Sequence, residues 1–291
     1  MRPPRQTLPI CPVCDDTGWK PLDEGGVRRV VRCQCWLQQT GSNRLAEARI
    51  PRRYRHCSVE SFRAYNDSLC GAVRRARRFI DEYPASERGL LLLGHAGVGK
   101  THIAVGVLRA VIEKTGAPGL FYDTRDLLTA IRSTYDPVVK TSTSRILQPV
   151  METPLLVLDD LGSERPTDWV EETMNLIVNT RYNERRTTLF TSNYSDVPDN
   201  EDPNALVARI GFRMRSRLHE MCSVVEIDAG DFRDTDKPKN ATDEDLLALW
   251  KLKKRPKDLP TRSYRSAKAQ LREPARDGRA ELKWPGGRAG S

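Results

Sequence analysis

The chain has no apolar run approaching the length of about 18 residues that makes a segment a candidate to cross a membrane. We therefore expect no membrane partner. The opening residues, MRPPRQTLPI, lack the apolar core of a secretory signal, so the expected location is cytoplasmic. Apolar residues make up only 38% of the 291 positions, and mean hydropathy is −0.58. These values favour polar segments beside a folded core over one compact globule.

Acidic residues are scarce at the C-terminal end. Residues 251–291 contain 13 Lys and Arg against 4 Asp and Glu, so the formal net charge of +9 lies there and residues 1–250 are neutral overall. One amphipathic helix is expected from Thr242 to Lys253. We expect residues 239–291 to form a basic tail that is partly disordered. Such a tail can hold nucleic acid by counterion release, or it can act only to keep the protein soluble.

Cysteine is concentrated near the N-terminus. Cys11 and Cys14 form C-x-x-C, and Cys33 and Cys35 form C-x-C, with 18 residues between the pairs. Without an export signal, this cluster indicates metal before disulfide, and unliganded thiols are the alternative. Two short knuckles joined by a hairpin can supply the four thiolates that Zn²⁺ prefers. We predict a zinc-knuckle module over residues 1–43, for docking rather than catalysis because four Cys leave no open coordination position.

The most specific motif is GHAGVGKT at positions 94–101, a full match to G-x-x-x-x-G-K-[ST]. An apolar run at 89–93 precedes it and apolar residues at helical spacing follow it, so the loop leaves a buried strand and enters a helix. Lys100 is predicted to reach the β and γ oxygens of ATP, and the Thr101 hydroxyl to ligate Mg²⁺. The alternative is a chance glycine-rich turn. The backbone N–H groups that can surround the phosphates belong to Gly94, His95, Ala96, Gly97, Val98, Gly99, Lys100 and Thr101.

Strands and helices alternate from Arg88 onward, which predicts an α/β fold with a parallel sheet. Residues 44–87 are predicted to form a basic helical linker, with an apolar face over residues 72–80 and four arginines on the opposite face. Those arginines indicate either a solvated face or a nucleic-acid contact. Five strands are expected, at residues 89–93, 119–123, 154–160, 187–191 and 224–227, with helices at 127–135, 169–182 and about 204–221.

A pair of acids follows the third predicted strand. Four apolar residues precede Asp159 and Asp160, about 60 residues after the phosphate loop, a pattern typical of a Walker B strand. Asp159 is predicted to hold Mg²⁺ through its water shell. Asp160 is predicted to orient and deprotonate the attacking water. An ordinary Asp-Asp-Leu-Gly turn is the alternative.

Two further features belong to the segments that follow. Asn193 ends the fourth strand and can position the same water. In the next helix, Arg209, Arg213 and Arg217 recur at every fourth position and therefore form one stripe. The stripe is either a solvated face or an arginine offered to the nucleotide of a neighbouring chain.

The motifs in order, GHAGVGKTHIA, LLVLDDLGSE, LFTSNY, RMRSRLHE and DFR, resemble AAA+ proteins of the DnaC/DnaI helicase-loader and IstB transposition-helper group over about residues 50–235. The resemblance implies an AAA+ P-loop ATPase over residues 88–238 without a C-terminal lid. It implies that His102 lies near the nucleotide and that Asn193 is sensor 1. It also implies that Arg217 is the arginine finger with Arg213 second, and that Arg233 is the sensor 2 arginine.

The resemblance leads to an expected function. In DnaI-like loaders an N-terminal cysteine knuckle engages the replicative helicase, so we expect an ATPase that loads a hexameric replicative helicase onto single-stranded DNA. ATP would join the chain into a homo-oligomer, the phosphate loop of one copy facing Arg217 of the next. One alternative is an IstB-like helper of a transposase. Another is a nucleotide-gated adaptor with little hydrolysis, because Asp160 stands where AAA+ proteins usually have Glu.

Overall fold

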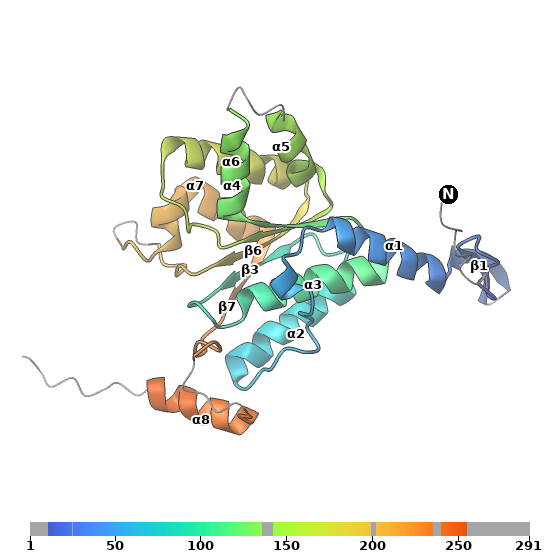
Figure 1. Ribbon diagram of the computed structural model, residues 1–291, viewed down its shortest axis with the longest axis horizontal. Coiled ribbons are helices and arrows are strands. Elements are labelled where there is room, and N and C mark those ends of the chain that lie inside the picture. Colours follow the sequence, from blue (N-terminus) through green and yellow to red (C-terminus); the bar gives the residue numbers. More distant parts are fainter. Residues whose placement is uncertain (1–10, 25, 136–141, 199–201, 235–239, 255–291) are drawn as a thin grey trace, which may run out of the picture. The chain divides into compact units, whose positions relative to one another are not determined.

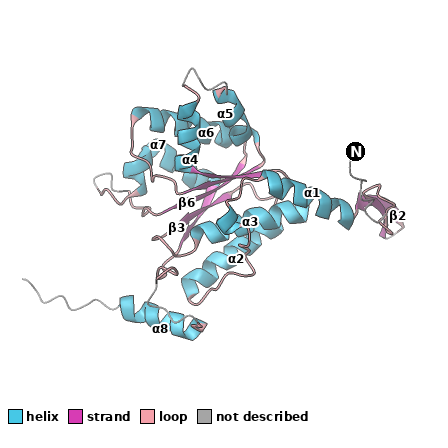
Figure 2. Cartoon of the chain, in the orientation of Figure 1, coloured by secondary structure: helices cyan, strands magenta, loops and turns pink. Residues whose placement is uncertain are grey.

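A five-stranded parallel sheet forms the centre of the computed structural model, which describes residues 11–24, 26–135, 142–198, 202–234 and 240–254. The predicted sheet is confirmed, and its strands have the order β4-β5-β6-β3-β7. Figure 2 shows the strands of the chain in magenta, with β3 and β6 labelled. β3 pairs with β6 on one side and with β7 on the other, so the phosphate loop leaves the sheet where ligands usually bind. The strands are β3 (Gly89–Leu93), β4 (Gly119–Asp123), β5 (Leu155–Asp159), β6 (Thr187–Ser192) and β7 (Cys222–Glu226).

Helices cover both faces of this sheet (Figure 1). α2 and α3 pack on one face, against alternate strand residues such as Leu90 and Leu92. α4, α5, α6 and α7 pack on the other face, against Leu91 and Leu93. Because both faces are covered, β3 and β5 are buried along their whole length. The helices are α2 (Asp67–Glu82), α3 (Lys100–Thr115), α4 (Thr124–Ser133), α5 (Thr143–Glu152), α6 (Asp168–Asn183) and α7 (Leu206–Met221).

The structure moves or adds some elements relative to the sequence prediction. α4 begins three residues earlier than expected, because the Asp123 side chain accepts hydrogen bonds from the backbone N–H groups of Arg125 and Asp126 at 2.9 and 3.2 Å. The last strand begins at Cys222 rather than Val224. α5 was not expected, since it has 10 residues and contains Pro149, and proline disfavours a helix interior.

The N-terminal segment forms a hairpin followed by a helix. β1 (Trp19–Glu24) and β2 (Val27–Arg32) pair antiparallel, which confirms the expected hairpin. α1 (Gln34–Glu47) was not predicted, and it crosses the expected limit between the module at 1–43 and the linker at 44–87. It packs closely on α3, because a Cβ added to Gly41 would lie 3.5 Å from the Glu113 Cα. A single helical turn, η1 (Arg52–Tyr54), follows it.

The predicted helix after the sheet is also present, as α8 (Asp243–Lys254). Thr242 and Asp245 cap its start: the Thr242 N–H donates to Asp245 Oδ2 at 2.8 Å, and the Asp245 N–H donates to Thr242 Oγ1 at 3.2 Å. The remainder of the predicted basic tail, residues 255–291, lies outside the described residues. No helix in the described ranges has the length and apolar character needed to cross a membrane.

Candidate nucleotide-binding site

The phosphate loop, residues 94–101, joins β3 to α3. Gly94, Gly97 and Gly99 have φ of +148°, +79° and +98°, angles that disfavour residues with a side chain. Space excludes side chains there too: a Cβ on Gly94 would lie 2.3 Å from the carbonyl oxygen of Ile227, and one on Gly97 would lie 1.7 Å from Asp231 Oδ1. The loop therefore has the backbone shape that its sequence predicts.

Lys100 lies in the first turn of α3 and is buried. Its Nζ donates to the carbonyl oxygens of Gly94 and His95 at 2.8 Å and to Asn193 Oδ1 at 2.6 Å. Burial lowers the pKa of Lys100 to about 8, although Asp160 and Asp159 act in the opposite direction. The ammonium is thus held over the phosphate loop and remains mainly charged at pH 7.

Thr101 and Asp159, the two predicted magnesium ligands, are in contact. Thr101 Oγ1 donates to Asp159 Oδ1 at 2.9 Å, and Thr191 Oγ1 donates to the same oxygen at 2.6 Å. Burial raises the pKa of Asp159 to about 6, although these two hydroxyls lower it. A hydroxyl and a carboxylate at the end of a phosphate loop are hard oxygen donors of the kind Mg²⁺ takes, so the pair fits that ion.

Asp160 and Asn193 meet beside this pair. Asn193 Nδ2 donates to Asp160 Oδ1 at 2.6 Å, so its amide bridges Asp160 and Lys100. Asp160 has φ of +61°, a left-handed conformation that Asp tolerates better than most residues. Its N–H donates to Thr191 Oγ1 at 2.9 Å. The structure therefore brings together four of the predicted catalytic residues, Lys100, Asp159, Asp160 and Asn193.

His102 and Arg233 contact two segments that adjoin the loop. The Nε2 of His102 is 2.9 Å from the Ser58 carbonyl oxygen, and its ring meets Phe62 edge-on at 5.3 Å. Arg233 Nε and Nη2 donate to the two oxygens of Asp231 at 3.1 Å. The charge of Arg233 is close enough to contribute to the lowered pKa of Lys100. Both residues thus lie near the loop, and their implied roles at the nucleotide stay predictions.

The prediction that three arginines of α7 form one continuous stripe is wrong. Gly211 has φ of 77° and ψ of 160°, which interrupts α7 between Arg209 and Arg213. Arg209 is directed to the loop after β5, where it donates to the Gly162 and Glu164 carbonyl oxygens at 2.9 and 3.0 Å. Arg213 and Arg217 follow the interruption and remain one turn apart, and Arg217 Nη1 donates to the Arg213 carbonyl oxygen at 3.3 Å.

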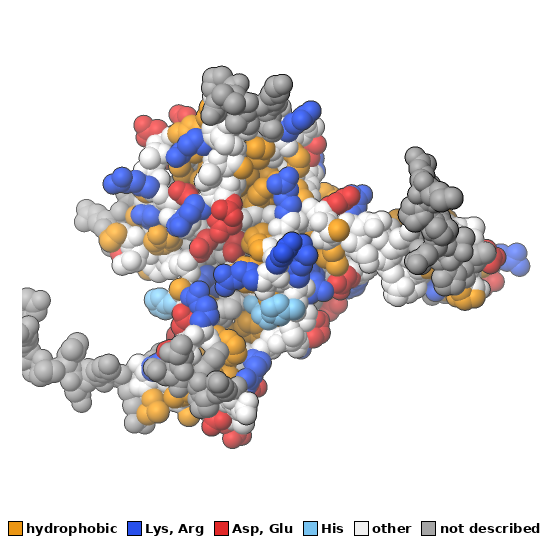
Figure 3. Space-filling model, viewed as in Figure 1, with side chains coloured by type: hydrophobic (Ala, Val, Ile, Leu, Met, Phe, Trp, Pro, Cys, Tyr) orange, Lys and Arg blue, Asp and Glu red, His pale blue; other side chains and the backbone are white. Residues whose placement is uncertain are grey.

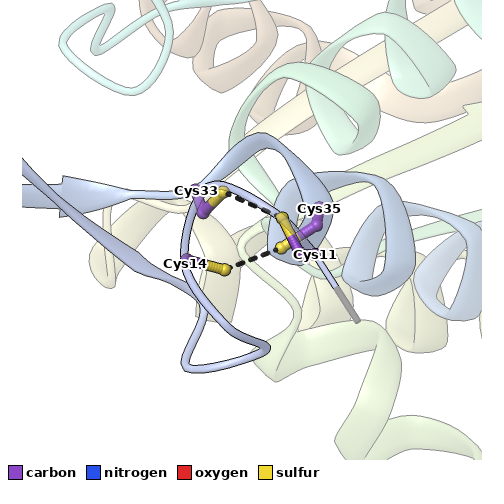
Figure 4. A group of neighbouring side chains, drawn as sticks. All are labelled: Cys11, Cys14, Cys33 and Cys35. Carbon is purple, nitrogen blue, oxygen red and sulfur yellow. Dashed lines mark hydrogen bonds between the residues drawn. The ribbon is translucent and has the colours of Figure 1, made fainter. Parts of the chain in front are cut away.

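The four N-terminal cysteines form a compact cluster (Figure 4). The sulfurs of Cys14 and Cys35 are 3.3 Å apart and those of Cys11 and Cys33 are 3.9 Å apart, and all four lie within 4.8 Å of one another. Tetrahedral Zn²⁺ with Zn–S bonds of about 2.3 Å places its sulfurs about 3.8 Å apart. The cluster therefore fits zinc, and Cys35 connects it directly to α1.

Comparison with known proteins places these motifs in a family. A sequence model described as "IstB-like ATP binding protein" matches residues 75–240, more than half of the chain. The chain belongs to the IstB-like ATP-binding protein family. Among curated proteins, it is similar to the replicative helicase loader DnaC of Escherichia coli (strain K12), with 24% identity over 140 residues. That match covers 48% of this chain and 56% of DnaC, so the chain spans about half the length of the relative.

Solved structures also resemble this member of the IstB-like family. The DnaC helicase loader crystal structure has 36% sequence identity and a TM-score of 0.55, covering 61% of this chain and all of that one. The DnaI crystal structure has 25% identity and a TM-score of 0.54, covering 65% of this chain and all of that one. The AAA+ fold and the DnaC-like relationship expected from the motifs are therefore confirmed.

Several site residues of this IstB-like protein were missed by the sequence prediction. Thr191 contacts Asp159, Phe62 lies against Gly99, and Asp231 lies against Gly97. Thr191 precedes Ser192 and Asn193 at the end of a predicted strand, and its position beside the Walker B strand was the available indication. Asp231 is the first residue of the DFR motif, which was its available indication, whereas Phe62 had none because it reaches the loop only through tertiary packing.

Zinc should be bound by the cysteine cluster at one ion per chain, because the four sulfurs have a spacing that fits it. We expect Cys14→Ser to lower the zinc content to a small fraction of the wild-type value when the purified protein is analysed by mass spectrometry of metals. Cys70→Ser is the matched control, since Cys70 is exposed and outside the cluster. Equal zinc in both variants would show that the cluster is not the site.

Magnesium binding should weaken at low pH, because a proton competes with the metal at Asp159. The raised pKa of about 6 means that the folded protein binds this proton more tightly than the unfolded chain, whose value is near 3.8. Below pH 6 we expect the apparent Mg²⁺ affinity of the ATP-bound protein to fall by up to about tenfold per pH unit. Mg²⁺ titrations of the ATP-bound protein at pH values from 7.5 to 5 measure this affinity.

Asp159→Asn is the control for this pH series. Protonation of ATP itself affects both proteins equally and therefore cancels in the comparison. The Asn variant should bind Mg²⁺ more weakly at pH 7.5 and lose the part of the pH dependence that belongs to the protein. Identical pH profiles for the two proteins would rule out Asp159 as the titrating group.

Proposed function

We propose that this protein is an ATP-dependent loader that binds a hexameric replicative DNA helicase and places it on single-stranded DNA. The main support is the convergence of Lys100, Asp159, Asp160 and Asn193 in a chain similar to solved DnaC and DnaI structures. The proposed division of labour follows the expected segments: a zinc module at 1–43 for docking, a linker at 44–87, the ATPase domain at 88–238 and a basic tail at 239–291.

The site residues suit hydrolysis of ATP to ADP and phosphate. Lys100 neutralises charge on the β and γ oxygens, and the loop N–H groups hold the phosphate chain. Thr101 and Asp159 would hold Mg²⁺, which would supply further charge neutralisation when bound. Asp160 and Asn193 orient a water whose oxygen bonds to the γ-phosphorus as the bond to the ADP oxygen breaks. Asp160 accepts the proton of that water.

Arg217 is proposed to act on the nucleotide of a neighbouring copy. No hydrogen bond or ion pair among the described residues joins Arg217 to the phosphate loop of its own chain, and the residue is half-buried. ATP would then hold adjacent copies together, and its hydrolysis would loosen that joint and release the helicase.

An exposed aromatic and basic cluster supports a role on single-stranded DNA. Trp169 Nε1 donates to the Tyr135 hydroxyl at 3.3 Å, their rings meet edge-on at 6.3 Å, and the Arg132 guanidinium lies 4.7 Å from the Trp169 ring centre. Tyr135 is 60% exposed. Aromatic rings stack on unpaired bases, and a nearby Arg neutralises phosphate. On the face in Figure 3, Lys and Arg are dispersed with acidic residues between them, so charge alone marks no continuous DNA path there.

Removing both rings should weaken DNA binding. Stacking contributes about 1–3 kcal/mol per base, so we expect Tyr135→Ala with Trp169→Ala to lower affinity for an oligo-dT by at least about tenfold in fluorescence anisotropy with ATP present. Leu176→Ala is the control, as an exposed apolar residue on the same helix as Trp169. Unchanged affinity in the double variant would reject this cluster as the DNA site.

The decisive test of the loader function is co-purification with a replicative helicase. Wild-type protein should form a complex with the hexamer in ATP, and Lys100→Ala should not respond to ATP. Helicase assembly on a DNA circle, where no free end permits threading, should require both proteins. Absence of any ATP-dependent complex would reject the proposal.

A transposition helper is the second candidate. The family match favours it, because the family is named for IstB-like proteins. The cysteine cluster supports the loader, because it provides a docking module outside the matched residues 75–240. A transposase gene adjacent to the gene for this chain would reverse that order.

A nucleotide-gated adaptor with little hydrolysis is the third candidate. The short Asp160 side chain is already engaged by Asn193, which supports slow turnover. If the short side chain of Asp160 limits the rate of ATP hydrolysis, Asp160→Glu should raise ATP turnover. A wild-type rate no higher than that of Lys100→Ala would favour the adaptor.

A further inference from the structure

α8 begins beyond the residues matched by the IstB-like family, yet its side chains reach back to contact residues of the segments 58–66 and 228–234. Leu246 is only 6% exposed and the preceding Ala241 only 7% exposed, so both side chains near the start of the helix are buried. Leu252, on the same helix, is 60% exposed. The helix is therefore anchored through one side.

The first segment that α8 contacts is residues 58–66. Arg63 donates to Asp243 Oδ1 from Nε at 2.9 Å and from Nη2 at 2.7 Å, and also to the Ala241 carbonyl oxygen at 2.7 Å. The neighbouring Phe62 lies against the phosphate loop, because a Cβ on Gly99 would be 2.5 Å from its ring. One side of the loop is thus connected to α8 through two adjacent residues.

The second segment is residues 228–234. Trp250 lies 3.8 Å from where a Cβ on Gly230 would be, and Lys253 forms an ion pair with Asp234. Phe232 lies between Gly230 and Asp234 in the sequence, and its N–H donates to the Gly97 carbonyl oxygen at 3.0 Å. The phosphate loop is therefore connected to α8 through Gly97 as well as through Gly99.

The two segments are themselves joined, although they are more than 150 residues apart in the sequence. The Gly230 N–H donates to the Tyr65 hydroxyl at 3.1 Å, and Asn66 Nδ2 donates to the Asp228 carbonyl oxygen at 3.1 Å. The segments, the loop and α8 form a closed set of contacts. Movement of α8 would therefore shift both segments that contact the loop.

We propose that α8 is a clamp that holds residues 58–66 and 228–234 against the phosphate loop and slows release of bound nucleotide. This inference rests on the proposed ATP site. Residues 243–254 lie outside the family match, and the proposal makes them positioning residues for the phosphate loop. The exposed Arg63–Asp243 pair contributes little by itself, so the test targets Leu246, the buried side chain of the helix.

Dissociation of a fluorescent ATP analogue from the full chain tests the clamp by stopped flow. Leu246→Ser should detach α8 and speed dissociation by roughly fivefold or more, the lower end of typical coupling between sites. Leu246→Met should restore the slow rate, since it retains the apolar volume. Leu252→Ser is the matched control and should leave the rate unchanged, because that side chain is exposed.

Trp250→Ala provides a second variant should Leu246→Ser fold poorly, and it too should speed release. A wild-type protein that binds no ATP would reject the proposed function rather than the clamp. A wild-type protein that binds ATP, with unchanged release in Leu246→Ser and Trp250→Ala, would overturn the clamp and leave the proposed function intact. Faster release in the Leu252→Ser control equal to that in Leu246→Ser would also overturn it.

Discussion

Arg217→Ala should lower ATP turnover by about 10³-fold or more while leaving ATP binding by the isolated chain nearly unchanged. An arginine supplied by a neighbour neutralises charge that develops in the transition state, an effect that reaches 10³–10⁵-fold in related chemistry. Because Arg217 has no contact with its own phosphate loop among the described residues, ground-state binding in one chain should not depend on it. Steady-state phosphate release and equilibrium nucleotide titration measure the two quantities.

Two variants control this experiment. Lys100→Ala sets the floor, since it removes the ammonium that contacts the loop carbonyls and Asn193. Arg213→Ala removes an exposed arginine one turn earlier in α7, and its turnover should stay well above that floor. ATP-dependent self-association, followed by light scattering, should weaken in Arg217→Ala. If Arg217→Ala retains wild-type turnover and the protein never self-associates in ATP, the shared-site mechanism is wrong.

Arg181→Met should lower the free energy of unfolding by about 3–5 kcal/mol. Arg181 is fully buried and hydrogen-bonds to segments far apart in sequence: Nη1 donates to the Val150 and Thr153 carbonyl oxygens at 2.9 Å, and Nη2 donates to the Thr187 carbonyl oxygen at 2.6 Å. Burial lowers its pKa to about 9, so it is still charged at pH 7. Methionine fills similar space but leaves those buried carbonyls without a donor.

Urea unfolding at pH 7 measures this loss. Arg185→Met is the control, because Arg185 is exposed and its ion pair with Glu87 spans 3.7 Å between exposed side chains. We expect that control to change stability by no more than about 0.5 kcal/mol. Similar losses for both variants would show that the buried hydrogen bonds of Arg181 contribute no special stability.

The main elements of the site could be predicted because their signatures are local. The spacing of Gly94, Gly99 and Lys100 fixes a phosphate loop, and the apolar run before Asp159 fixes a buried strand that ends in acids. The arginine stripe could not be predicted correctly, because the bend at Gly211 does not disturb the apolar pattern of the helix. Four apolar residues stay buried on both sides of the bend: Leu206, Ile210, Met214 and Leu218.

The sequence by itself determined the parallel α/β sheet, the phosphate loop, the Walker B acids and the cysteine spacing, because each depends on residues a few positions apart. Tertiary structure decided that the Thr191 hydroxyl donates a hydrogen bond to Asp159 and that Phe62 and Asp231 lie against the phosphate loop. It also decided that α8 contacts the two segments to which Phe62 and Asp231 belong. Those contacts join segments separated by up to about 180 residues. They depend on how buried faces pack, which no local spacing specifies.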